Sequence, residues 1–154
     1  RNIDVHLTVL SNTTNKLVMK YLEKNELGHL DHKVLFLSRD ELSNAISKFH
    51  ILGFALKKSF SLIASMPTKI AESLACGTPI ICNNFNSDIE EMIAENKIGI
   101  LYDFSSPLTD SKYREIINLI QDESTSEICS DFSTNHFSLQ AGVKKYREIY
   151  NNIK

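Results

Sequence analysis

The 154-residue sequence predicts an α/β fold: a Rossmann-like open parallel sheet with helices on both faces. Two observations carry this prediction. Short β-branched, apolar runs recur along the first two thirds of the chain, and the segments between them repeat apolar residues at helical spacing. Strands and helices that alternate in this way are joined by right-handed crossovers, which build a parallel sheet covered on both faces. We expect one domain over residues 1–154.

Five strands are expected, each a short run bounded by polar or turn residues, at 5–10, 33–37, 51–56, 79–82 and 98–102. Helical periodicity predicts helices at 16–24, 41–49, 67–76 and 89–95, and then two more at 112–120 and 138–153. We expect Asp40 to cap the second helix and Ser87, with Glu90 three residues later, to cap the fourth. Gly77 is placed to end the third helix in a left-handed turn.

Composition narrows the classes of function. The net charge of −2 disfavours a nucleic-acid partner, which would need a broad basic surface. The three cysteines have no CxxC spacing, so we expect reduced thiols and no zinc site. His29, Asp31 and His32 fall in a turn after Gly28, and the side chains of such a group more often face solvent than bind a metal. No run approaches the length of a membrane-spanning helix.

The segment that opens the third predicted helix carries groups that suit a phosphorylated ligand. A helix amino terminus has unpaired N–H groups and the positive end of the dipole, so it attracts anions. Pro67 gives the first turn a fixed φ, and Thr68 and Lys69 add a hydroxyl donor and a cation. Glu72 lies one turn further along the face of Thr68, where it could accept hydrogen bonds from a vicinal diol such as ribose. The segment is therefore suited to a nucleotide.

A plainer interpretation of the same residues stays open. Lys69 and Glu72 are three positions apart, and this spacing also allows an exposed ion pair that contributes only a few tenths of a kcal/mol. Pro67 could serve only to start the helix. The same holds for Lys57 and Lys58, which follow a strand: a solvated basic pair is favoured over a phosphate contact.

The third helix and the strand after it resemble a known family motif. The matching residues are Pro67, Lys69, Glu72, Leu74, Ala75, Gly77, Pro79, Ile80 and Ile81. They are similar to the P-x-K-x-x-E-x-L-A-x-G-x-P-V-I string in the carboxyl-terminal half of retaining GT-B glycosyltransferases of the glycosyl transferases group 1 family. Further segments are similar to the family and occur in its order, one before this motif at 50–56 and four after it at 88–93, 99–101, 137–139 and 146–150. The resemblance therefore covers about two thirds of the chain.

The resemblance implies a set of residues that contact a nucleoside-diphosphate sugar, while the catalytic residues stay unknown. The set is Glu72, Lys69, Thr68, Pro67, Met66, Ser38, Arg39 and Glu91. In the family, Glu72 would bind the ribose hydroxyls and the segment from Met66 to Lys69 would lie near the diphosphate. Ser38 and Arg39 would approach the nucleobase.

Two departures from the family pattern concern the donor sugar. The first glutamate of a widely spaced pair should lie eight residues before Glu72, but that position is Ala64. Where relatives have a glycine-rich loop, this chain has Phe85, Asn86 and Ser87, which predicts a bulkier or altered sugar pocket. Glu91 matches a position that lies near the donor sugar in relatives.

The function that the resemblance implies is transfer of a sugar, with retention and of hexosyltransferase type, to a glycan or lipid-linked acceptor. No cofactor and no metal are implied, since the nucleotide sugar is itself the substrate. The expected setting is cell-surface polysaccharide biosynthesis in the cytoplasm, with peripheral association of the full-length enzyme at the inner face of the membrane. We expect an amino-terminal acceptor domain outside this chain, and no sugar transfer by the chain alone.

Two alternatives remain. A nucleotide-sugar epimerase of GT-B-like architecture would hold the same ligand. A non-enzymatic α/β interaction or regulatory domain is the other alternative, although a receiver-type module would need clustered acidic residues after its first strand, where this chain has Ser11, Asn12, Thr13 and Thr14.

Overall fold

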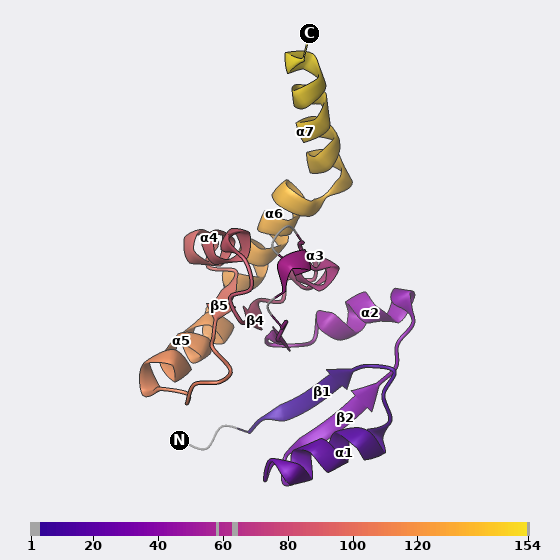
Figure 1. Ribbon diagram of the computed structural model, residues 1–154, viewed down its shortest axis with the longest axis vertical. Helices are drawn as coiled ribbons and strands as arrows, with labels where there is room; N and C mark the ends of the chain where they lie inside the picture. Colours follow the sequence, from indigo (N-terminus) through magenta and orange to yellow (C-terminus); the bar gives the residue numbers. More distant parts are fainter. Residues whose placement is uncertain (1–3, 58, 63–64, 154) are drawn as a thin grey trace. The chain divides into compact units, whose positions relative to one another are not determined.

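The computed structural model describes residues 4–57, 59–62 and 65–153, and it has the predicted α/β class with parallel strands. The chain forms two compact units, Arg1–Leu42 and Ser43–Lys154. All five predicted strands are present. Hydrogen bonds join them as a two-stranded sheet in the first unit and a three-stranded sheet in the second, where one continuous sheet was expected (Figure 1).

The first unit is a β-α-β element. Strands β1 (His6–Leu10) and β2 (Asp31–Leu35) pair in parallel over their whole length, and helix α1 (Asn15–Lys24) connects them. Thr14 caps α1 by accepting a hydrogen bond from the Leu17 amide at 3.3 Å. The second strand was predicted two residues too late in the sequence. Its first residues are polar, but their backbone groups complete the ladder with β1, and an apolar pattern does not detect such pairing.

Helix α2 (Arg39–Ile46) begins and ends earlier than predicted. Asp40 lies inside the helix and is not its cap. Ser38 precedes the first turn, and its amide and hydroxyl both donate to Glu41 Oε2, at 2.9 and 2.6 Å. This is half of a capping box, in which the third helical residue reaches back to the cap amide. The two hydrogen bonds also hold the pKa of Glu41 below its ordinary value.

The second unit contains the sheet of β3 (Leu52–Phe54), β4 (Ile80–Cys82) and β5 (Gly99–Leu101), in that order. Around it lie a short 3₁₀ turn, η1 (Phe60–Leu62), and the helices α3 (Thr68–Ala75), α4 (Ser87–Asn96), α5 (Asp110–Gln121), α6 (Thr125–Phe137) and α7 (Leu139–Asn152). Ile80 and Cys82 on one face of β4 are fully buried in a core shared with α3, α4 and α6. Ile100 of β5 points to the other face, where α5 contacts the strand.

The start of one helix in this unit differs from the prediction, and the end of another agrees with it. Asn86, and not Ser87, caps α4, because its side chain accepts a hydrogen bond from the Ile89 amide at 2.9 Å. Glu90 instead accepts from the side chain of Asn84. Gly77 ends α3 with φ +71°, as predicted, and the amides of Gly77 and Thr78 return to the last turn of the helix in a Schellman motif.

Helix α6 was not predicted. Its buried face carries Thr125, Cys129, Phe132 and Ser133, and half of these side chains are hydroxyls that an apolar pattern does not count. Both hydroxyls have hydrogen-bond acceptors: Thr125 donates to the Leu119 carbonyl, and Ser133 donates to a carbonyl of α3. These small side chains let α6 lie directly against α3.

Candidate functional site

The amino terminus of α3 is open, although Pro67 lies outside the helix rather than in its first turn. Pro67 is the N-cap residue, with φ −63° and ψ 129°, and it supplies no side-chain cap. Its carbonyl accepts the Ile70 amide at 3.0 Å. Within the described residues, the amides of Thr68 and Lys69 have no hydrogen-bond acceptor, and both side chains are exposed. Two N–H groups and the positive end of the helix dipole therefore face a ligand or solvent.

Lys69 lies beside these amides at the carboxyl end of β3. Its ammonium group is 5.4 Å from the centre of the Phe54 ring, and Phe54 is the last residue of that strand. A cation over an aromatic face is attracted by the negative charge of the ring, so the contact favours this position of the side chain. The carboxyl edge of a parallel sheet is where ligands of such folds bind.

Glu72 lies one turn down the helix and is half-buried. It lines a shallow hollow of about 360 Å³ between α3 and α6, together with Ala71, Ala75, Ser133 and Phe137 among others. No hydrogen bond or ion pair of Glu72 is found within the described part of the chain. Burial raises the pKa of the Cys76 thiol, and the negative charge of the Glu72 carboxylate raises it further.

The exposed ion pair considered above is not formed. The ion pairs recorded among the described residues involve neither Lys69 nor Glu72. Both charged groups are thus available to a ligand. An ion pair within the helix therefore does not explain Lys69 and Glu72. Their contact with a nucleotide-sugar donor stays a prediction.

Two asparagines connect the loops around this site by hydrogen bonds, a role that the sequence did not reveal. Asn83, directly after β4, bonds both the amide and the carbonyl of Leu56 through its side chain, at 2.8 and 2.9 Å. Asn86 donates to the carbonyls of Leu62 and Ser65 at 3.1 and 3.0 Å while it caps α4. The loop after β4 is therefore tied to the segment that leads into α3. The partners are 21 to 27 residues apart in the chain, so only the folded structure could identify them.

The remaining predicted site residues lie outside α3. Met66 is exposed just before Pro67, and Glu91 is exposed on α4. Ser38 and Arg39 belong to the first unit, and the hydroxyl of Ser38 is engaged by Glu41. Ala64 and Lys58 lie outside the described residues, so the positions predicted for the missing glutamate and for the second lysine of the basic pair are not described.

Phe85 does not enlarge the polar surface of the loop. Its side chain is 5% exposed and belongs to the core of the second unit. The Phe85 side chain therefore adds no bulk at the surface of the loop, and the expected change of the sugar pocket stays a prediction. Asn86 is half-buried and Ser87 is exposed.

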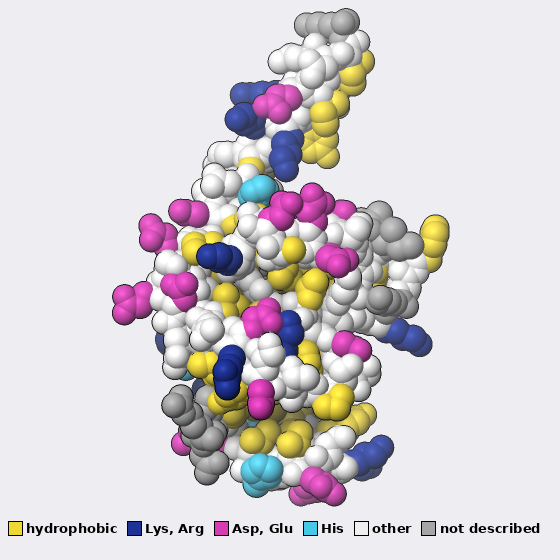
Figure 2. All heavy atoms as spheres, turned by 90° about the vertical axis from the view of Figure 1, so that its left-hand side faces the viewer, with side chains coloured by type: hydrophobic (Ala, Val, Ile, Leu, Met, Phe, Trp, Pro, Cys, Tyr) yellow, Lys and Arg dark blue, Asp and Glu magenta, His cyan; other side chains and the backbone are white. Residues whose placement is uncertain are grey.

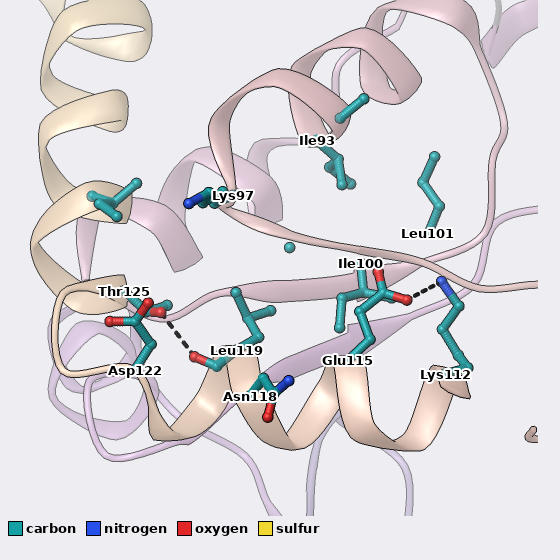
Figure 3. A pocket seen from close by; sticks show the side chains of 13 residues that line it. Ile93, Lys97, Ile100, Leu101, Lys112, Glu115, Asn118, Leu119, Asp122 and Thr125 are labelled. Atoms are coloured by element: carbon teal, nitrogen blue, oxygen red, sulfur yellow. Dashed lines mark hydrogen bonds and ion pairs between the residues drawn. The ribbon is translucent and has the colours of Figure 1, made fainter. Parts of the chain in front are cut away.

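A second hollow, of about 460 Å³, lies beside β5 and between α4 and α5 (Figure 3). Its walls are apolar, with Ile93, Ile100 and Leu119, and the ion pair of Lys112 with Glu115 lies at its edge. None of the predicted donor residues lines it. Nor does any group of three or more His, Cys, Asp or Glu side chains within the described ranges have the arrangement of a metal site.

The sequence profile of the family described as "Glycosyl transferases group 1" matches residues 1–136 of the chain. The chain belongs to the glycosyl transferases group 1 family. The match includes α3 and every predicted donor residue, and it ends before α7. The resemblance noted from the motif at Pro67–Ile81 is thereby confirmed.

Two solved structures are similar to this glycosyltransferase-family chain to different degrees. A chain in the structure described as "Crystal structure of GtfA/B complex" matches with a TM-score of 0.59 and 14% sequence identity, over 96% of this chain and 29% of that one. Another, described as "Crystal Structure Analysis of the Glycotransferase of kitacinnamycin", has a TM-score of 0.47 and 17% identity, over 85% of this chain and 38% of that one. The chain thus spans less than two fifths of either. No curated protein matches it.

The first of these likenesses supports the predicted GT-B type of α/β fold. It does not extend to a ligand, because identity is low. None of the described helices is both long enough and apolar enough to span a bilayer.

Proposed function

We propose that this chain is the donor-binding part of a glycosyltransferase that transfers a sugar from a nucleoside-diphosphate sugar to a glycan or lipid-linked acceptor. The observation that carries the proposal is the open amino terminus of α3, with two free amides and Lys69 beside them, in a chain of the glycosyl transferases group 1 family. Retention, a hexosyl donor and a role in cell-surface polysaccharide synthesis at the inner membrane face are finer parts of the same proposal.

The chemistry follows from the charge that develops during transfer. When the bond between the sugar and the diphosphate breaks, negative charge increases on the departing diphosphate oxygens. Fixed N–H dipoles and a nearby cation stabilise the transition state, in which this charge has developed, more than they stabilise the ground state. The barrier to transfer is therefore lower. The amides of Thr68 and Lys69 and the Lys69 ammonium are the groups that would do this.

Glu72 would hold the nucleoside. Glu72 lies four positions after Thr68, which places the two about 6 Å apart along the helix axis on one face. That separation suits a ligand with phosphate at the helix end and ribose one turn below. A carboxylate with two free oxygens can accept a hydrogen bond from each of two neighbouring hydroxyls.

The test compares ribose with 2′-deoxyribose. Calorimetry would measure binding of ADP, GDP and UDP, and then of the 2′-deoxy form of the diphosphate that binds best. Glu72→Gln keeps the shape of the side chain and removes its charge. We expect at least about a tenfold loss of affinity for the ribonucleotide, because hydrogen bonds to a charged acceptor are roughly twice as strong as neutral ones. The loss should be smaller for the 2′-deoxynucleotide, which keeps only the 3′ hydroxyl as a donor to Glu72.

Glu95→Gln is the matched control, since Glu95 is an exposed carboxylate on α4. It should leave both affinities unchanged. Equal affinities of Glu72→Gln and the parent for the ribonucleotide would remove Glu72 from the site. No binding of any of these diphosphates by the parent chain would remove the proposal itself.

Transfer activity is a separate question. We expect the purified chain to bind nucleotide without transferring sugar, because the acceptor site is proposed to lie outside it. Sugar transfer by the chain alone would contradict that division. Release of an epimerised nucleotide sugar would instead favour the epimerase alternative.

A further inference from the structure

The outer edge of strand β5 carries backbone groups without hydrogen-bond partners. In the parallel ladder with β4, Ile80 pairs with Gly99, and the Ile80 amide donates to the Ile98 carbonyl. This arrangement turns the N–H and C=O groups of Gly99 and Leu101 away from β4, to the other edge of the strand. Within the described residues, none of these four groups has a hydrogen-bond partner, and no described strand pairs with that edge.

The free edge of β5 lies in the hollow of about 460 Å³ between α4 and α5. Gly99 and Leu101 both line this hollow and are half-buried. Ile93 of α4 lies on one side of the strand and Leu119 of α5 on the other (Figure 3). A half-buried N–H or C=O group without a partner costs free energy. The hollow therefore suits a ligand that hydrogen-bonds in the plane of the sheet and has apolar surface on both faces.

The charged side chains around the hollow balance one another. They are Lys97, Lys112, Glu115 and Asp122, and Lys112 forms an ion pair with Glu115. Figure 2 views the molecule from the side on which α4 and α5 lie in Figure 1, and it shows hydrophobic side chains between side chains of both charges. A neutral ligand fits this balance better than an anion such as a diphosphate does.

We propose that the hollow beside β5 is a second ligand site, which binds a flat, neutral heterocycle of the nucleobase class. The Gly99 carbonyl accepts a hydrogen bond from an amino group of the ring, and the Leu101 amide donates to the neighbouring ring nitrogen. The two faces of the ring pack against Ile93 and Leu119. The volume is within the range of small-molecule pockets, about 300–1,000 Å³, which are mostly apolar with a few polar groups.

A compact ring fits the hollow better than an added peptide strand does. A strand that pairs with a sheet edge usually spans five or six residues, about 17–20 Å, whereas β5 has three residues. Thr125 and Ile128 of α6 also line the hollow. None of the predicted donor residues lines it, so the proposal does not depend on the donor site at α3.

The test uses bases that have neither ribose nor phosphate, so that the groups proposed to bind at α3 are absent. Nitrogen–proton correlation NMR spectra of the 154-residue chain would be recorded with 9-methyladenine and with 1-methylcytosine. We expect the amide signals of Gly99 and Leu101 to shift, with a Kd of about 1 mM or below for the better base. The N6-dimethyl derivative of 9-methyladenine, which has no N–H donor, should bind at least about tenfold more weakly.

A variant that fills the hollow has a matched control. Ala94 is exposed and lines the hollow, so Ala94→Phe should place a ring in it and weaken binding of the base at least about tenfold. Glu95→Phe introduces the same ring one position further along α4, about 100° around the helix and outside the lining residues, and should change binding less than about twofold. Circular dichroism should show that both variants keep the helix content of the parent.

Three results would overturn the proposal. The first is that neither base, at about 10 mM, shifts the amide signals of Gly99 and Leu101. The second is equal binding of 9-methyladenine and its N6-dimethyl derivative, and the third is equal binding by Ala94→Phe and Glu95→Phe. If a nucleoside diphosphate binds while the bases leave β5 unchanged, this inference fails and the proposed donor site stands.

Discussion

Gly77 is a residue at which a single added carbon should have a clear effect. It ends α3 at φ +71°, a conformation that side-chain-bearing residues adopt at a cost of about 1–2 kcal/mol. A Cβ built there would lie 2.2 Å from Ser126 Oγ and 3.2 Å from the Ser126 carbonyl oxygen. The hydroxyl can rotate away, at about 0.5–1.5 kcal/mol for a less favoured rotamer, whereas the carbonyl belongs to the first turn of α6.

Gly77→Ala should therefore destabilise the protein by about 2–3 kcal/mol. Urea unfolding followed by circular dichroism measures the free energy of unfolding. Ser126→Ala alone should cost less than about 0.5 kcal/mol, because Ser126 is exposed. In the double variant the hydroxyl clash is absent, so the cost should fall by about 0.5–1.5 kcal/mol below the sum of the single variants.

Gly142→Ala is the opposite control. Gly142 lies inside α7, and a Cβ there would have nothing within 4 Å. The change should be neutral, or stabilise the helix by up to about 1 kcal/mol. The reasoning is refuted if Gly77→Ala costs less than about 0.5 kcal/mol, or if the single and double variants show no coupling.

Two further predictions concern buried polar groups. Asn83→Ala should lower the free energy of unfolding, measured in urea, by about 1–3 kcal/mol, because it leaves the amide and carbonyl of Leu56 without their partners. A decrease below about 0.5 kcal/mol would show that water replaces the side chain. Burial raises the pKa of Cys82 and Cys129 to about 11, so both thiols should resist a thiol-directed reagent at pH 8 until the protein unfolds. The free energy of unfolding should also fall as the pH rises above 9, because the thiols then ionise in the unfolded chain but not in the folded protein. Rapid labelling of more than Cys76 in the folded protein would contradict this assignment.

The strands and most helices were predictable because their information is local. Among the residues that the structure describes, alternation and helical spacing identified all five strands and six of the seven α-helices, with ends displaced by up to three residues. Helix α6 escaped because buried Thr125 and Ser133 count as polar in any pattern. Their hydroxyls are buried at little cost only because carbonyls from α5 and α3 lie within reach, which is a property of the folded chain.

The candidate site divides in the same way. The motif at Pro67–Ile81 identified α3 because its residues are consecutive in the sequence. The supports of the site, Asn83 and Asn86, hydrogen-bond across 21 to 27 residues, and asparagine in a loop has many local uses that a sequence cannot separate. Capping was predicted at the right places but often with the wrong residue, since Ser, Asp and Asn neighbours are equally suitable in sequence and only the backbone selects one.

The start of α3 differs from most other helix starts in the chain, and the difference bears on function. Thr14, Asn86, Thr109 and Ser138 each cap a helix by accepting a backbone amide through the side chain. Pro67 occupies the same position in α3 and has no such acceptor. A side-chain cap contributes about 1 kcal/mol, so its absence leaves α3 less stable than it could be. The same absence keeps two amides free beside Lys69, and a bound diphosphate would satisfy them in place of a cap. A helix start without a side-chain cap is thus one at which a bound anion could take the place of the cap.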